Sequence, residues 1–136
     1  MRVLLATDGK PHSEKAVEYG FALYKQFKPT FVALYVVDPR SGIEKDKDIK
    51  NGMRVLGRLK IRGADIGIEV ATLLEAGDPM ETILLAAQRI KADAIVLGKT
   101  TDRSTGGGLL GGSKSISEFI IKNSTCPVIV VKSGSP

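Results

Sequence analysis

The chain has 136 residues, 43% hydrophobic and 26% charged, which is ordinary for a globular protein with a sizeable core. Trp is absent and aromatic residues are few, so the stacking platforms that bind single-stranded nucleic acid are scarce. No apolar run approaches the length of a transmembrane helix, and the N-terminus reaches Asp8 too early for a signal peptide. We therefore expect one cytoplasmic domain over residues 1–136.

The net charge is +5, and basic residues concentrate in one segment that has a helical pattern. These bases are Lys45, Lys47, Lys50, Arg54, Arg58, Lys60 and Arg62. Because acids precede them, as the helix dipole prefers, a solvated helix face is favoured over a nucleic-acid patch. Cys126 is the only cysteine, so no internal disulfide can form, and we expect a small buried side chain there.

The first half of the chain predicts two buried strands, each followed by a helix. The apolar runs 3–6 and 31–37 do not alternate with polar residues, as expected of strands covered on both faces. Pro11 suits the first turn of the first helix, and Pro29 is expected to end it. The apolar stripe of this helix is predicted to be Ala16, Gly20, Leu23 and Phe27. The second helix is predicted over 43–62, with one face formed by Ile49, Met53, Leu56 and Lys60.

The second half predicts three further strands and two helices. Apolar residues alternate with polar or small ones at Ile66, Ile68 and Val70, which indicates a half-buried edge strand. The run Asp78-Pro79-Met80-Glu81 is typical of a capped helix start. The buried stripe of that helix is predicted to be Ile83, Ala87 and Ile90. Strand 94–97, a Gly-rich loop, a helix from about Ser115 and strand 128–131 follow.

This regular alternation predicts an α/β fold, with a five-stranded parallel sheet that carries helices on both faces. Right-handed crossovers are expected between its strands. In such a sheet a ligand binds at the carboxyl ends of the strands, where the strand order reverses.

The Gly-rich loop between the fourth strand and the last helix has the pattern of a phosphate site. A glycine lets the backbone approach a phosphate, and a helix N-terminus adds its positive dipole. The candidates for this approach are Gly98, Gly111 and Gly112, and the candidate hydroxyl donors are Ser113 and Ser115. The candidate charge partners are Lys99, Arg103 and Lys114. The alternative is a structural loop whose glycines only turn the chain.

Two residues after other strands are candidates for nucleoside recognition. Asp8 follows the first strand, and it can accept a hydrogen bond from a ribose hydroxyl or an adenine amino group. Val36 lies near the end of the second strand and can pack on the base. His12, the only histidine, is expected to be an exposed polar residue at a helix start.

Two other phosphate-binding classes fit the sequence less well. Residues 108–115 differ by one residue from the P-loop pattern Gly-x4-Gly-Lys-Ser, and Asp38 resembles a Walker-B acid. A P-loop follows its strand at once, however, whereas residues 98–108 intervene here. An aspartyl-phosphate receiver needs clustered acids at strand ends, and no acidic pair follows the first strand.

The chain resembles the universal stress protein family over essentially its full length. The resemblance is carried by Val3-Leu4-Leu5-Ala6-Thr7-Asp8-Gly9, Ser13-Glu14-Lys15-Ala16, Gly77-Asp78-Pro79 with Ile83, Asp93-Ala94-Ile95-Val96-Leu97-Gly98 and Cys126-Pro127-Val128-Ile129-Val130-Val131. It implies a flavodoxin-like fold, of the adenine-nucleotide α-hydrolase type. It also implies a homodimer that pairs through the last strand, Val128-Ile129-Val130-Val131.

The same resemblance implies a site for ATP or another adenine nucleotide, with Mg²⁺ held largely by the phosphates. Family contacts map onto Ala6, Thr7, Asp8 and Val36. The ATP-binding branch carries Gly-x2-Gly-x9-Gly-(Ser/Thr) after the fourth strand. In one alignment Gly98 is the first Gly, Thr101 takes the second position, and Gly111 precedes Gly112 and Ser113. In the other, Ser115 matches the family's Ser, and Lys114 stands where Gly is usual.

The residues and the resemblance together predict a regulatory or stress-response sensor that binds an adenine nucleotide. The alternative is a protein-interaction module that has the same fold and binds no nucleotide. Slow ATP hydrolysis is a third hypothesis. We expect no dedicated catalytic residue and no metal site made by side chains alone.

Overall fold

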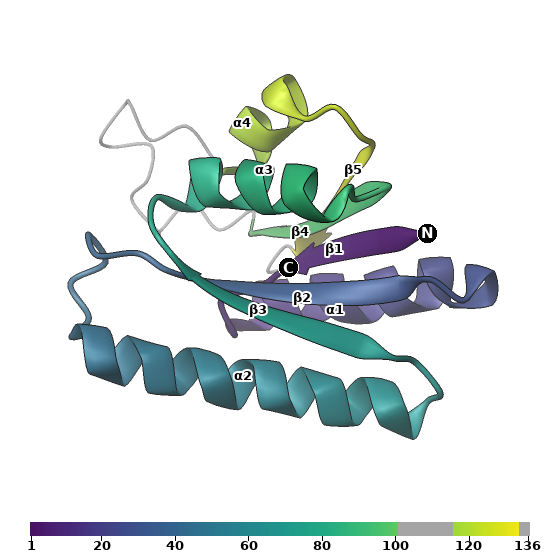
Figure 1. The fold of residues 1–136 in the computed structure, drawn as a ribbon, viewed down its shortest axis with the longest axis horizontal. Coiled ribbons are helices and arrows are strands. Elements are labelled where there is room, and N and C mark those ends of the chain that lie inside the picture. Colours follow the sequence, from purple (N-terminus) through teal and green to yellow (C-terminus); the bar gives the residue numbers. More distant parts are fainter. Residues whose placement is uncertain (101–115, 134–136) are drawn as a thin grey trace.

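The computed structural model describes residues 1–100 and 116–133. Within these residues, five strands form one parallel sheet in the order β3-β2-β1-β4-β5 (Figure 1). The strands are β1 (Arg2–Ala6), β2 (Thr30–Val37), β3 (Val70–Ala76), β4 (Ala94–Thr100) and β5 (Val128–Ser133). The predicted parallel sheet is confirmed, and β3 lies at its edge as predicted, although two of the three alternating residues that led to this prediction precede the strand.

Helices cover both faces of the sheet, as predicted. The helices are α1 (Pro11–Tyr24), α2 (Lys45–Asp65), α3 (Pro79–Ile90) and α4 (Ile116–Asn123), and α1 continues into the short 3₁₀-helix η1 (Lys25–Phe27). α1 and α2 pack on one face, and α3 and α4 pack on the other (Figure 1). In the described part of the chain, no helix has both the length and the apolar character needed to cross a membrane.

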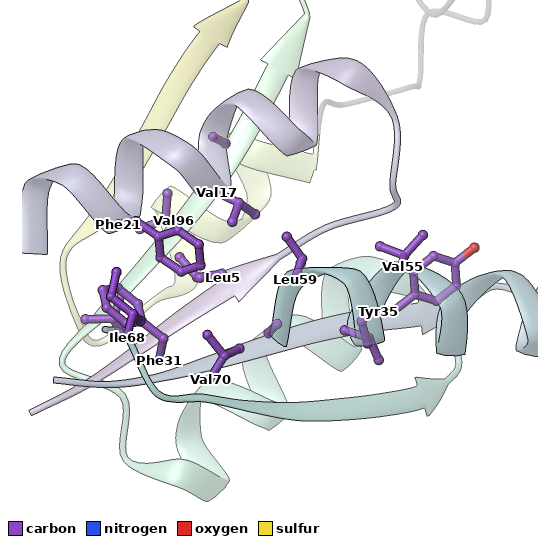
Figure 2. Close-up of a cluster of buried hydrophobic side chains, with 14 of the residues drawn as sticks. Leu5, Val17, Phe21, Phe31, Tyr35, Val55, Leu59, Ile68, Val70 and Val96 are labelled. Carbon is purple, nitrogen blue, oxygen red and sulfur yellow. The ribbon is translucent and has the colours of Figure 1, made fainter. Parts of the chain in front are cut away.

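The core consists of two layers, one on each side of the sheet. Because successive strand residues point to opposite faces, Leu5 contributes to the α1–α2 layer and Leu4 to the α3–α4 layer. Figure 2 shows the first of these layers, where the Phe21 and Phe31 rings meet edge to face with centroids 5.1 Å apart. Strands buried on both faces need apolar residues at every position, which explains the unalternating runs in β1, β2 and β4.

The buried face of α1 differs from the predicted stripe. Leu23 and Phe27 are 39% and 59% exposed, so their assignment to the core is wrong. The helix instead buries two adjacent rows of side chains along its length. The buried residues are Ser13, Ala16, Val17, Gly20 and Phe21. The α-helix ends at Tyr24, well before Pro29, and Phe27 belongs to η1. The tighter winding of a 3₁₀-helix carries Phe27 off the α-helical stripe.

α2 also differs from its prediction, in both its bounds and its buried face. It begins and ends later than the predicted 43–62, and Met53 is 64% exposed. Lys60, also placed on the predicted face, is exposed. The buried residues of α2 are Asp48, Gly52, Val55, Leu56, Leu59 and Gly63. The inward face is therefore shifted from the one that apolar spacing alone indicated.

Gly52 explains the shift, because it is the point where α2 comes closest to the sheet. A Cβ added there would lie 2.6 Å from the Tyr35 ring and 2.7 Å from Leu74 Cδ1. Only a residue without a side chain allows this approach. A search for apolar stripes does not count glycine as an inward-facing residue, and it therefore selects a neighbouring face.

The connections on either side of β3 contain two further differences. Ile66 and Ile68 precede β3 and are not part of it, since α2 extends to Asp65. Asp78 occupies the N-cap position of α3, but its side chain makes no capping hydrogen bond. Its Oδ1 instead accepts from Arg40 Nη2 at 2.6 Å, a charge-assisted bond that is stronger than one from a neutral N–H.

Candidate functional site

A cavity of about 620 Å³ opens at the carboxyl ends of β1, β2 and β4. Its volume lies within the usual range for small-molecule sites. From β1 the chain continues to β2 and β3 on one side of the sheet, and β4 and β5 lie on the other side of β1. The strand order therefore reverses between β1 and β4. Open α/β sheets bind their ligands at this point, and the cavity lies where the sequence places the candidate site.

The structure brings half of the predicted site residues together around this cavity. They are Ala6, Thr7, Asp8, Val36 and Gly98. The other predicted contacts lie outside the described residues; they are Thr101, Gly111, Gly112, Ser113 and Ser115. The same holds for Arg103, Lys114 and the whole P-loop-like segment 108–115.

The turn after β1 presents Asp8 at the cavity. Thr7 is buried and holds the turn, because its Oγ1 accepts from the Gly9 N–H at 3.0 Å. Asp8 Oδ1 accepts from the backbone N–H of Lys10 at 2.9 Å. The Asp8 side chain is 46% exposed, and a carboxylate has about four lone-pair sites, so it can accept further hydrogen bonds from a ligand.

Gly98 lies where the start of α1 crosses the end of β4. A Cβ there would lie 2.5 Å from the carbonyl oxygen of His12 and 3.1 Å from Ser13 Cα. This backbone contact alone requires a glycine, independently of any phosphate. His12 lines the cavity and is only partly exposed, and its Nε2 lies 3.9 Å from Asp8 Oδ2.

The two sides of the cavity differ in chemistry, because alternating strand residues point to opposite faces of the sheet. The side toward α3 and α4, here called the apolar side, is lined by Ala6, Leu34, Val36, Pro79, Ile83 and Leu97. The side toward α2, here called the α2 side, is lined by Tyr35, Asp48, Asn51, Arg54 and Arg58, and Lys10 lines the cavity from the turn after β1. A flat apolar base fits the first side, and polar or charged groups fit the second.

A chain of hydrogen bonds runs along the α2 side. The Tyr35 hydroxyl donates to Asp48 Oδ1 at 2.6 Å and accepts from Asn51 Nδ2 at 2.8 Å. Asn51 Oδ1 in turn accepts from Arg54 Nη2. Asp48 is 4% exposed. Burial, and then the hydrogen bond to Asp48, raise the pKa of Tyr35 above its ordinary 10.0, so the phenol stays a proton donor.

Arg40 connects two loops at the rim of the cavity. Its Nε lies 3.1 Å from Asp38 Oδ1, and its Nη2 lies 2.6 Å from Asp78 Oδ1. Burial alone would raise the pKa of Asp38, but the hydrogen bonds and charge of Arg40 outweigh burial and lower that pKa. Asp38, the acid compared above with a Walker-B residue, is therefore engaged by Arg40. The loop after β2 is fastened to the start of α3.

Sequence reasoning missed the whole α2 side of the cavity. The apolar spacing predicts the wrong inward face for α2, and the charge pattern assigns its basic residues, Arg54 and Arg58 among them, to a solvated helix face. Asp48, Asn51 and Val55 follow one another at helical spacings, which is the signal that was available. An acidic residue on the same helix face as a valine indicates a buried polar contact. In the described part of the chain, no group of three or more His, Cys, Asp or Glu residues could hold a metal ion.

Known proteins resemble this chain over nearly its whole length. The model of the universal stress protein family matches residues 1–132. A universal stress protein of Methanocaldococcus jannaschii is 31% identical, in an alignment that covers 96% of this chain and 81% of that protein.

Solved structures share the fold. A universal stress protein from Archaeoglobus fulgidus in complex with dAMP superposes with a TM-score of 0.73 at 20% identity, over 97% of this chain and 98% of that chain. A universal stress protein family protein from Arabidopsis thaliana with AMP bound superposes with a TM-score of 0.71 at 21% identity, over 97% of this chain and 91% of that chain.

Proposed function

The chain belongs to the universal stress protein family, and from this premise we propose that its cavity binds an adenine nucleotide. The observation that carries the proposal is the convergence of Asp8, Val36 and Gly98, from three different strand ends, on one cavity of about 620 Å³. The dAMP and AMP complexes of proteins with this fold support the choice of an adenine nucleotide.

The chemistry of the lining suggests how the nucleotide lies. We place the adenine on the apolar side against Val36 and the ribose beside Asp8, whose carboxylate accepts a hydroxyl proton. The 5′ phosphates then extend toward the start of α4, where Ile116 and Ser117 line the cavity and the helix dipole favours an anion. ATP or another adenine nucleotide is the proposed ligand, and its Mg²⁺ is held largely by the phosphate oxygens.

We further propose a regulatory role. The described residues that line the cavity are suited to binding a ligand. Hydrogen bonds of Arg40 and Tyr35 connect the elements that form its walls. Binding of the nucleotide is proposed to report a stress state to a protein partner. Two copies are proposed to pair through β5.

Calorimetric titration with AMP, and with ATP and Mg²⁺, tests the nucleotide proposal. Wild-type protein should bind one nucleotide per chain. Asp8→Asn should weaken binding by about tenfold or more, because a hydrogen bond to a charged group contributes about 1.5–3 kcal/mol.

Asp46→Asn is the matched control, since Asp46 is an exposed acid at the start of α2 and does not line the cavity. This variant should bind as the wild type does. Failure of the wild type to bind either nucleotide contradicts the proposal. Equal affinities of wild type and Asp8→Asn refute the role given to Asp8.

A further inference from the structure

The lining of the cavity includes three cationic residues, Lys10, Arg54 and Arg58, to which the proposed adenosine 5′-phosphate assigns no partner. We propose that these three residues form a second anion subsite at the α2 side of the cavity, and that the ligand is an adenine nucleotide with an additional phosphate on its ribose. The position of the ribose rests on the proposed function. The anion subsite itself rests on the residues of the α2 side.

The first argument is the availability of cationic donors at the cavity. Within residues 1–100 and 116–133, neither Lys10 nor Arg54 forms an ion pair with a carboxylate. Arg58 pairs with Glu14 at 3.0 Å, but Arg62 shares the same carboxylate at 3.5 Å. A guanidinium has five N–H donors in a fork that matches a phosphate, so donors are left over for a ligand.

The acids that line the α2 side and its rim are already engaged. Asp48 accepts from the Tyr35 hydroxyl at 2.6 Å, and Asp38 accepts from Arg40. Asp8 accepts from the N–H of Lys10, which places a lysine next to the one exposed carboxylate of the cavity. Asp48 and Asp38 are therefore each bonded to a neighbouring side chain, and neither forms an ion pair with Lys10, Arg54 or Arg58.

The second argument is the way Arg54 is held. The hydrogen bonds on the α2 side all run toward the core. Arg54 donates to Asn51, Asn51 donates to Tyr35, and Tyr35 donates to buried Asp48. Burying a carboxylate and a phenol in a core wall costs free energy that an apolar wall would avoid. The arrangement fixes the guanidinium through one N–H and leaves the others available, which is the preorganisation an anion site requires.

The third argument is that a phosphate on the ribose could reach the α2 side from the proposed position of the ribose. In the proposed pose the ribose lies beside Asp8, whose carboxylate accepts from the backbone N–H of Lys10 in the same turn, so the 2′ and 3′ hydroxyls would lie near Lys10. A phosphate on one of these oxygens would enter the α2 side, and the other hydroxyl would still donate to Asp8. The 5′ chain points the opposite way, toward α4. A ribose-phosphorylated adenine nucleotide therefore uses both sides of the cavity.

Calorimetry with AMP and with adenosine 3′,5′-bisphosphate tests the inference. The bisphosphate should bind wild type about tenfold or more tightly than AMP does, since charge-assisted hydrogen bonds are among the strongest. Arg54→Gln should reduce this ratio of affinities to near one. Lys50→Gln, which changes an exposed lysine of the same helix outside the cavity, should keep the wild-type ratio.

Tyr35→Phe separates positioning from direct contact. It removes the hydroxyl that anchors Asn51, so the ratio should fall part of the way, provided that circular dichroism shows a folded protein. If the wild type binds the bisphosphate and AMP with about equal affinity, the inference is overturned. It is also overturned if Arg54→Gln keeps the wild-type ratio of the two affinities.

Titration with inorganic pyrophosphate distinguishes failure of the subsite from failure of the proposed function. If the wild type binds no nucleotide but binds pyrophosphate, and Arg54→Gln does not, the anion subsite stands and the nucleotide proposal falls. If the wild type binds neither nucleotide nor pyrophosphate, both proposals fall.

Discussion

Tyr35 is the residue at which the hydrophobic core and the candidate site meet. Its ring packs between β2 and α2 beside Val55, and its hydroxyl oxygen lies at the outer end of the cluster (Figure 2). The side chain thus contributes apolar area to the core and a hydrogen bond to the cavity wall. Replacing it affects stability and the site together, so a measurement specific to the hydroxyl is needed.

The ionisation of Tyr35 provides that measurement. Its pKa is raised by burial first and by the hydrogen bond to Asp48 second, so the folded state prefers the neutral phenol. A raised folded pKa means that this contribution to stability is complete below pH 10 and is lost as the pH rises through the folded value. Ultraviolet titration of tyrosinate should show one ionisation above pH 10 that Tyr35→Phe removes.

Tyr19→Phe is the control for this titration, because Tyr19 is 52% exposed on α1. The late ionisation should persist in that variant. If Tyr35→Phe and wild type give titration curves that differ only by an ionisation at or below pH 10, the raised pKa that burial and the hydrogen bond to Asp48 give Tyr35 is contradicted.

α2 is the element whose sequence is hardest to interpret and whose position matters most for the site. It carries Gly52 on its inner face, against Tyr35 and Leu74, and Gly57 on its outer face, with nothing within 4 Å of an added Cβ. The two glycines belong to the same helix but stand in opposite environments. They therefore form a matched pair.

The pair predicts opposite changes in stability. Gly52→Ala should lower the free energy of unfolding by about 1–3 kcal/mol, because the methyl group overpacks the contact with the sheet. Gly57→Ala should raise it by about 0.5–1 kcal/mol through the better helix propensity of alanine. Urea unfolding followed by circular dichroism measures both. Changes of the same sign would contradict the close approach of α2 at Gly52.

The strands could be predicted from the sequence because their signal is local. β1, β2 and β4 are buried on both faces, and their continuous apolar runs are sufficient to identify them. The positions of Asp8, Val36 and Gly98 followed from those strands, since the carboxyl ends of parallel strands converge. This part of the site was therefore accessible to sequence reasoning.

The rest of the site depends on contacts between distant segments. Asp78 bonds to Arg40 instead of capping its own helix, and no local pattern reveals that choice. The inward face of α2 depends on glycine contacts, which a hydrophobic pattern does not register. Asp48 lies in a run of charged residues along the chain, yet its partner Tyr35 lies on a strand. These features arise from packing, and they became visible only with the fold.

At the scale of the whole molecule, β5 is the strand through which we propose that two copies pair. It is an edge strand, and its residues 128–131 are all half-buried. Exposed edges of apolar strands are sites for pairing with another chain. Among the described residues, Val130 belongs to neither core cluster, and we therefore choose it to test the proposed pairing.

We predict that wild-type protein sediments as a dimer and that Val130→Lys sediments as a monomer, because a charge in this interface opposes pairing. Thr72→Lys, an exposed position on the opposite edge strand β3, should leave the dimer intact. Analytical ultracentrifugation distinguishes the species. A monomeric wild type, or a dimer that Val130→Lys does not disturb, would contradict pairing through β5.

Recognition of an adenine nucleotide at the carboxyl ends of β1, β2 and β4 is the central claim, and identification of a co-purified ligand tests it most directly. Protein purified without added nucleotide is denatured, and the released small molecules are separated by ion exchange and identified by mass. We predict a stoichiometric adenine nucleotide, with an additional ribose phosphate if the α2 side is an anion subsite. An empty protein that also takes up no added nucleotide would contradict the claim, and would favour an interaction module with this fold.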